Sequence, residues 1–232
     1  MVRYGRVRNT SILLYGLIQV LCILALSTAY NGYLHTKLHI DCLKDTKSSV
    51  TLEFLITYPY HTNISYRFPV CGQKESSSVS QIIRQGVLIR FVMCSAFFGL
   101  FFCIGMILSY IKLKIYDVDM YVIFGKGLAI EMVANAILAL LFFISSIFTT
   151  VIWVNIKSIA NKSYLSTPLL YCQQNFEYMT CKVEFTQRLS TFIVSVISMM
   201  ISSTLCVARL VNLLYMAQNR RQTLLATYLT VV

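Results

Sequence analysis

The sequence predicts an all-α membrane protein in which a four-transmembrane-helix bundle carries a small, disulfide-tied, β-rich subdomain. Of the 232 residues, 57% are apolar and only 12% are charged, whereas soluble domains carry about 25% charged residues. Four apolar stretches, at 11–30, 91–111, 132–154 and about 189–208, are free of charged side chains. Each is about 20 residues long, which is enough to cross the hydrocarbon layer as a helix, and the fourth helix is expected to continue to 215. So short a chain lacks the polar surface to bury four such helices in a soluble core.

These stretches divide the chain into nine segments. The spans are 11–30, 91–111, 132–154 and 189–215, and the parts between and around them are an N-terminal tail (1–10), a first loop (31–90), a middle loop (112–131), a second loop (155–188) and a C-terminal tail (216–232). The first span is longer than the 7–15 residues of a signal-peptide core, so we expect a retained anchor and keep a cleaved signal peptide as the alternative.

Basic residues near the span ends predict the orientation. Cytoplasmic ends of membrane proteins are enriched in Lys and Arg, and such residues occur here in the N-terminal tail, the middle loop and the C-terminal tail: Arg3, Arg6, Arg8, Lys112, Lys114, Lys126, Arg220 and Arg221. We therefore expect a multi-pass protein with both termini cytosolic and two large loops in the lumen. The formal charge of +11 is scattered rather than gathered into a stripe, so no nucleic-acid partner is expected.

The large loops hold two cysteines each, Cys42 and Cys71 in the first and Cys172 and Cys181 in the second. In an oxidising lumen paired thiols form disulfides. Three pairings are possible, and pairing within each loop is the simplest. A zinc site that includes His35, His39 and Cys42 is the rival interpretation, but no complete ligand motif with a fourth ligand accompanies them.

Two sequons and a strand pattern complete the view of the loops. Asn63 and Asn161 begin Asn-X-Ser sequons in the first and second loop, which makes them candidate glycosylation sites. Residues 49–60 alternate apolar and polar side chains, and 64–70 are rich in β-branched and aromatic residues. We expect these two runs to pair across a turn at 61–63 in a small antiparallel sheet, and we expect the second loop to be irregular.

The loop motifs resemble the synaptophysin family, which are four-span vesicle proteins of the MARVEL class. The first span exits into the first loop through Thr28-Ala29-Tyr30-Asn31-Gly32, and the loop then carries Tyr58-Pro59-Tyr60 and Phe68-Pro69-Val70-Cys71. The second loop carries Leu170-Tyr171-Cys172-Gln173-Gln174 and then Thr180-Cys181-Lys182. The likeness covers about residues 14–215, but the chain lacks the long Gly- and Tyr-rich tail of that family.

The resemblance implies a MARVEL-like bundle in the membrane of synaptic or secretory vesicles. It implies a homo-oligomer that binds membrane lipid and a synaptobrevin-type SNARE. Small residues in the second and fourth spans offer packing surfaces for such contacts: Gly99, Gly105, Ser195, Ser198 and Ser202. Two other interpretations stay open, namely a pore-forming or channel-associated protein and a claudin-like adhesion protein, although the first loop lacks the Trp-rich motif of claudins.

No catalytic motif is present, so we expect a protein that is not an enzyme. The sequence contains no HExxH, no Gly-rich phosphate loop and no G-x-S-x-G. No metal or cofactor is expected. Cholesterol is the one lipid ligand we consider, because two loose sterol patterns lie at span ends, with Tyr110 and Lys112 in one and Tyr215 and Arg220 in the other.

Polar residues inside the spans predict an intramembrane pair. Glu131 and Asn135 lie four residues apart at the start of the third span, and Arg209 and Asn212 lie three apart near the end of the fourth. The topology puts both sets at the same depth, so Glu131 can pair with Arg209 while the two asparagines hydrogen-bond nearby. In the alternative, Arg209 reaches the headgroups and Glu131 ends a solvated loop.

The predicted topology is tested by the cysteines. A non-reducing digest of the full-length protein is expected to link Cys42 to Cys71 and Cys172 to Cys181. Replacement of Cys71 should cost about 2–5 kcal/mol of loop stability and expose a free thiol. An impermeant thiol reagent that labels Cys42 or Cys172 from the cytosolic side would contradict the orientation.

Overall fold

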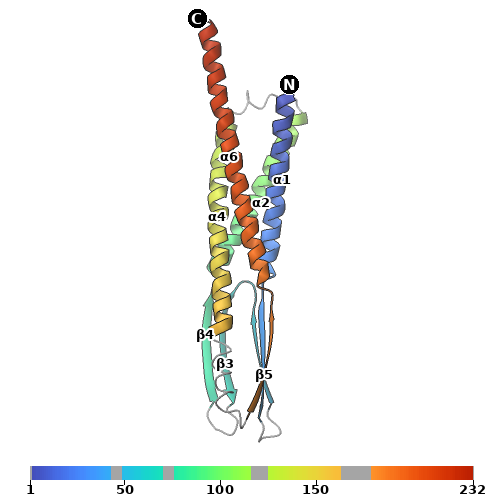
Figure 1. Ribbon diagram of the computed structural model, residues 1–232, viewed down its shortest axis with the longest axis vertical. Coiled ribbons are helices and arrows are strands. Elements are labelled where there is room, and N and C mark those ends of the chain that lie inside the picture. Colours follow the sequence, from blue (N-terminus) through green and yellow to red (C-terminus); the bar gives the residue numbers. More distant parts are fainter. Residues whose placement is uncertain (1, 43–48, 70–75, 116–124, 163–178, 232) are drawn as a thin grey trace. The chain divides into compact units, whose positions relative to one another are not determined.

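The computed structural model describes residues 2–42, 49–69, 76–115, 125–162 and 179–231. Within these ranges lie four long helices, α1 (Val2–Tyr30), α2 (Gly86–Ile115), α4 (Gly125–Lys162) and α6 (Ser190–Val231) (Figure 1). Each contains a segment long and apolar enough to cross a membrane: Asn9–Tyr30, Gly86–Lys112, Leu128–Ser158 and Ser190–Gln218. The prediction of four membrane-spanning helices is confirmed at this level.

All four helices extend beyond the predicted spans, and two of the extensions change how a predicted loop or tail is assigned. The helix α4 begins at Gly125, inside the segment predicted as the middle loop, and α6 continues to Val231 through the predicted tail. Glu131 therefore lies within α4, in its second turn, rather than at the end of a loop. This placement gives the Glu131 side chain a fixed direction relative to the rest of the helix.

The strands form two antiparallel sheets. The first has three strands in the order β2-β1-β5, where β1 is Leu34–Cys42, β2 is Ser49–Ile56 and β5 is Met179–Gln187. The second pairs β3 (His61–Pro69) with β4 (Ser76–Arg84). The central strand β1 thus bonds a strand from its own loop on one side and a strand from the second loop on the other.

The expected hairpin, in which 49–60 pairs with 64–70, is not formed, because each of the two runs pairs with a different strand. Residues 49–56 pair with β1, and the predicted turn at 61–63 is the start of β3. Strand β1 has the alternation of a half-buried strand, because Leu34, Leu38 and Ile40 occupy one face and His35, Lys37 and His39 the other. The alternation in β1 therefore indicates a strand, and this strand is the partner of β2.

The second loop is also more regular than expected, because it contains β5. Its residues alternate between the two faces of the sheet, with Met179, Cys181, Val183 and Phe185 at positions on one face. Opposite them in the register lie the even-numbered positions of β1. This period-2 pattern over nine residues is typical of a strand with one apolar face.

The chain folds into two compact units. The first combines Met1–Leu26, Val92–Ser146 and Val196–Val232, and the second combines Ser27–Phe91 and Ile147–Ser195. In the first unit the four helices bury one stripe each around a common core, which includes Tyr15, Ile18, Leu138 and Phe142. Their outward faces carry exposed large apolar side chains such as Leu13, Phe101 and Leu140, the surface that a lipid environment favours.

Small residues set the packing of the first unit. Gly99 on α2 lies against the Phe142 ring of α4, and a Cβ atom built on Gly99 would be 2.4 Å from Phe142 Cζ and 3.2 Å from Cys22 Sγ. The thiols of Cys22, Cys103 and Cys206 are fully buried, whereas Cys94 is exposed. The three buried cysteines act as small apolar residues between the helices.

Tyr60 organises the second unit. Its side chain is fully buried, its φ is 54°, and its hydroxyl lies 2.8 Å from the carbonyl oxygen of Ala29 and 2.7 Å from that of Gly32. The hydroxyl therefore contacts the carbonyl group of Ala29, one of those that the end of α1 leaves without a helical partner, and that of Gly32 just beyond the helix. Burial raises the pKa of Tyr60, which keeps this donor protonated. The Tyr60 ring packs 5.3 Å from that of Phe192.

The contact at Gly99 gives the first structural prediction. Gly99→Ala is expected to destabilise the bundle by about 1–3 kcal/mol, because the added methyl group collides with the Phe142 ring. The free energy of unfolding in detergent micelles measures the effect, and Phe142→Leu in the Gly99→Ala background should recover part of it.

Gly16→Ala is the matched control, since no atom lies within 4 Å of a Cβ at Gly16. This variant should be neutral or gain up to about 1 kcal/mol from helix propensity. Equal stability of the two alanine variants would contradict the packing described for Gly99.

Candidate functional site: a buried charged cluster shared by four helices

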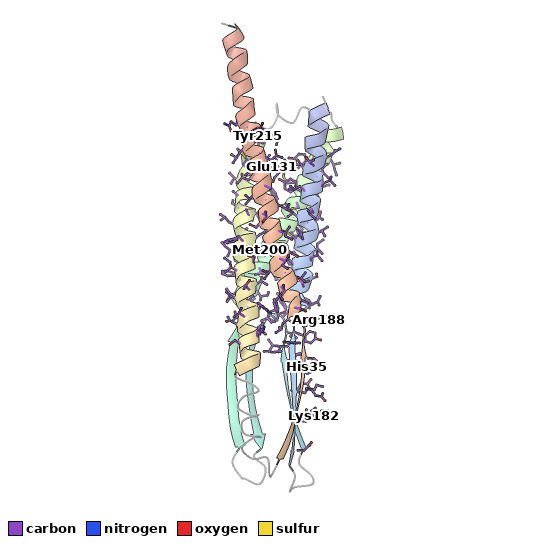
Figure 2. All side chains as sticks on the ribbon, in the orientation of Figure 1. His35, Glu131, Lys182, Arg188, Met200 and Tyr215 are labelled. Carbon is purple, nitrogen blue, oxygen red and sulfur yellow. The ribbon has the colours of Figure 1, made fainter. Side chains whose placement is uncertain are left out.

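All four helices of the first unit contribute to one cluster of buried polar side chains. It consists of Tyr15 from α1, Tyr110 from α2, Glu131 and Asn135 from α4, and Arg209 from α6, and every member is at most 6% exposed. Glu131 lies among the helices (Figure 2). Because ionised groups in a membrane-spanning segment are costly, their occurrence there marks a structural or functional requirement. We call these five residues the charged cluster.

An ion pair forms the centre of the charged cluster. Arg209 donates from Nε to Glu131 Oε1 at 3.0 Å and from Nη2 to the same oxygen at 2.8 Å. The guanidinium and carboxylate side chains are 3% and 7% exposed. Two charged hydrogen bonds converge on a single carboxylate oxygen, which leaves Glu131 Oε2 for another donor.

The two tyrosines complete the coordination of the carboxylate. Tyr15 donates its hydroxyl to Glu131 Oε1 at 2.7 Å, and Tyr110 reaches Oε1 at 3.0 Å and Oε2 at 2.9 Å. The Tyr110 oxygen in turn accepts from Arg209 Nη2 at 2.6 Å. Both rings lie 5.9 Å from the centre of the guanidinium, which adds a cation–π attraction to the hydrogen bonds.

Asn135 supports the charged cluster from one helical turn further along α4. Its Nδ2 donates to the Tyr15 hydroxyl oxygen at 2.9 Å and to the backbone carbonyl of Glu131 at 2.8 Å. Both acceptors require the amide nitrogen, so the orientation of the side chain is fixed. Asn135 Oδ1 is buried and has no hydrogen-bond partner among the described residues.

Three of the four residues predicted for the intramembrane pair come together, and the fourth does not. Glu131, Arg209 and Asn135 belong to the charged cluster, whereas Asn212 is exposed. The buried stripe of α6 runs through Ser202, Cys206 and Arg209 and then Leu213. Steps of four and three must alternate to keep to one face of a helix, so after the step from 206 to 209 the face continues at Leu213 rather than at Asn212.

The structure separates the residues predicted for a sterol contact. Tyr110 is 2% exposed and is committed to Glu131 and Arg209, so it does not offer its ring to lipid. The assignment of Tyr110 to a cholesterol contact is therefore wrong. Lys112 and Tyr215 are exposed, and the Arg220 side chain lies outside the described residues.

The residues predicted for the loops are placed only in part. Cys42 and Cys181 lie at the same end of the β1–β5 ladder, where Cys42 pairs with Met179 and Cys181 with Ile40. Cys71 and Cys172 lie outside the described residues, so both predicted disulfides stay predictions. Asn63 belongs to β3 and Asn161 to the last turn of α4.

The register also bears on the alternative of a zinc site. Strand alternation puts His35 and His39 on one face of β1 and the Cys42 position on the other. Among the described residues, no group of three His, Cys, Asp or Glu side chains could hold a metal ion.

Sequence reasoning missed Tyr15 and assigned Tyr110 a different role. A signal was present, because Tyr15 is a polar aromatic residue in the interior of an apolar stretch and not at its end, where tyrosines of membrane helices gather. A buried tyrosine hydroxyl needs a partner, and the buried carboxylate of Glu131 is an acceptor of matching depth.

The charged cluster is suited to holding helices together. One formal negative charge meets one positive charge, and the donors of both tyrosines and of Asn135 are used within it. Removal of any one helix would leave at least one of these groups without its partner. No family model matches the chain, and no curated protein is significantly similar to it. The likeness to the synaptophysin family therefore rests on the loop residues quoted above.

The charged cluster predicts a hierarchy of stability losses. Glu131→Gln is expected to be the most damaging single change, at about 3–5 kcal/mol, because it leaves the Arg209 guanidinium buried without a counter-charge. Tyr15→Phe removes one interhelical hydrogen bond and should cost about 0.6 kcal/mol, and at most about 2. Unfolding in detergent micelles followed by circular dichroism measures both.

A double-mutant cycle tests whether Glu131 and Arg209 act as a pair. The variant that combines Glu131→Gln with Arg209→Gln is expected to be more stable than Glu131→Gln alone, since no net charge stays buried. Asn212→Ala is the control on the exposed face and should change stability by less than about 0.5 kcal/mol. A coupling energy indistinguishable from zero would favour solvation of both charges.

Proposed function

We propose that this chain is a non-enzymatic, multi-pass vesicle membrane protein that acts through lateral contacts with other transmembrane helices. Its partners in this proposal are a single-span SNARE of the synaptobrevin type and further copies of itself. The observation that carries the proposal is the charged cluster, which uses the buried charges Glu131 and Arg209 within one molecule. Apolar outward faces are then the main surface that the helices offer to other molecules.

Lateral binding is supported by a notch on the outer face of α2. Gly105 is exposed, with no atom within 4 Å of a Cβ built on it, and Ser109 follows one turn later on the same face. The Ser109 hydroxyl donates to the Gly105 carbonyl oxygen at 2.8 Å, so the notch carries no unsatisfied hydroxyl donor. Two small residues four positions apart let a second helix approach closely in lipid. Phe101 and Leu108 flank the notch as exposed side chains.

The other small residues predicted for partner contacts are used within the chain. Gly99 packs against Phe142, and Ser195, Ser198 and Ser202 are buried. Of the five, only Gly105 lies on an exposed face. This narrows the proposed contact to α2.

The channel interpretation loses its main candidate for a pore lining. It requires the polar stripe of α6 to face an axis shared by several copies. Ser198, Ser202 and Arg209 are instead buried within a single molecule. A claudin-like protein would share the four spans and a sheet in the loops, but the first loop contains no Trp, so the Trp-rich motif of claudins is missing.

Crosslinking in native vesicles tests the proposal. Gly105→Leu is expected to reduce crosslinks to a synaptobrevin-type SNARE at least about threefold, because the larger side chain fills the notch, an effect of about 0.6 kcal/mol or more. Expression and thermal stability should stay unchanged, since the added atoms have open space. Truncation after Arg221 should leave the crosslinks in place.

Val133→Leu is the matched control, because Val133 is exposed on α4 and the change also adds apolar volume in lipid. Equal crosslinking of Gly105→Leu and the wild type would refute the α2 contact. If crosslinks are absent in the wild type and purified protein conducts ions in liposomes, the channel interpretation replaces the proposal.

A further inference from the structure

One face of the three-stranded sheet gathers ionisable side chains from three strands. Strand β1 contributes His35, Lys37, His39 and Asp41, strand β2 contributes Glu53, and strand β5 contributes Lys182 and Glu184. Lys37 is the register partner of Glu53 on one side and of Glu184 on the other. The two histidines lie two positions before and after Lys37, so each is a diagonal neighbour of both carboxylates.

Each histidine already contacts a carboxylate on a different neighbouring strand. His35 Nε2 lies 2.5 Å from Glu53 Oε1 on β2, and His39 Nε2 lies 3.9 Å from Glu184 Oε2 on β5. His35 and Lys182 are labelled on their strands in Figure 2. The other ring nitrogen of His39, Nδ1, is 2.9 Å from Thr51 Oγ1 on β2. The central strand thus reaches both neighbours through its imidazoles.

Of the remaining charged side chains on this face, some favour protonation of the histidines and others oppose it. Lys37 Nζ is 3.6 Å from Glu53 Oε1, and Lys182 Nζ is 3.2 Å from Glu184 Oε1. Lys182 is also the register partner of His39, so it opposes a positive charge there, whereas exposed Asp41 favours one. With neutral imidazoles, two lysines face three acidic residues and the net charge is −1; two protonated imidazoles change it to +1.

Both carboxylates stay ionised in mild acid. The hydrogen bond with His35, and next the charge of Lys37, hold the pKa of Glu53 below its usual range. The hydrogen bond and the charge of Lys182 hold the pKa of Glu184 below its usual range. Histidine is the side chain that ordinarily gains its proton between pH 8 and 5. An interval therefore exists in which imidazolium groups face carboxylates.

We propose that this face is an acid-strengthened clasp, in which proton uptake by His35 and His39 ties β1 more firmly to β2 and to β5. Because β1 and β2 belong to the first loop and β5 to the second, the clasp joins the two loops. Its contribution requires an imidazolium and a carboxylate together, so it is absent where the imidazoles are neutral. It is also lost as the pH falls through the lowered pKa values of Glu53 and Glu184, since their charged forms are required.

The clasp depends only on contact of this face with solution, so it is independent of the proposed function. In a vesicle with an acidic interior, it would be strongest inside the vesicle and would weaken when the loops meet a neutral exterior.

Amide hydrogen exchange of the full-length protein in nanodiscs tests the proposal. Protection of β1 and β5 amides, corrected for the intrinsic pH dependence of exchange, is expected to rise about two- to fivefold between pH 7.5 and 5.5, the range that exposed ion pairs provide. The variant that combines His35→Gln with His39→Gln should lose this rise and keep the protection of the wild type at pH 7.5.

Glu53→Gln combined with Glu184→Gln removes the partner charges and should also abolish the rise. His61→Gln is the matched control, because His61 belongs to β3 in the other sheet, and it should leave the rise intact. A wild type with equal protection at both pH values would overturn the proposal. A rise that survives in both the histidine and the glutamate variants would overturn it as well.

Discussion

A bilayer offers no water to a buried charge, and the Glu131–Arg209 pair shows what that constraint demands of the fold. Each ionised group needs a counter-charge and donors or acceptors supplied by the protein. Here Arg209 provides the counter-charge from α6, while Tyr15 from α1 and Tyr110 from α2 donate to the same carboxylate. The carboxylate on α4 is therefore satisfied only when all four helices are in place.

The same constraint explains why small and sulfur-containing residues line the rest of the first unit. In lipid, apolar burial gives little preference for one helix arrangement over another, because the tails are as apolar as leucine. Close packing and hydrogen bonds must select the arrangement. Gly99 admits the Phe142 ring, and the buried thiols of Cys22, Cys103 and Cys206 keep the helices close. The polar contacts thus fix which helices meet, and the small residues allow them to meet closely.

The sequence was sufficient for properties that depend on local composition. Apolar runs predict the four spans, and the spacing of Glu131 and Asn135, with the depth of Arg209, predicts that these residues meet. The contacts of Tyr15 and Tyr110 with Glu131 could not be predicted, because they depend on how the four helices are rotated about their axes; the sequence indicates only that Tyr15 needs a buried partner. Asn212 was misplaced for a related reason, since three-residue steps alone drift away from one face of a helix.

Strand pairing was harder to predict because it joins distant segments. The alternation in 49–56 indicates a strand but does not name its partner, and β1 and β5 lie on opposite sides of two membrane-spanning helices in the sequence. In the register, Leu38 lies between Leu52 and Val183. The apolar positions of the three strands therefore lie on the same face of the sheet, which the sequence of each strand alone does not show.

Because β1 is the central strand and its partner β5 follows α4 in the sequence, a cut between α4 and β5 divides the sheet between two fragments. A fragment that ends after α4 retains β1, β2 and three of the helices, and a fragment that begins at β5 retains one edge of the sheet and α6. The first fragment presents the open edge of β1 and the carboxylate of Glu131, and the second presents the matching edge of β5 and the guanidinium of Arg209. Each piece thus carries one strand of a backbone ladder and one partner of an ion pair, so the two halves are complementary in hydrogen bonding and in charge.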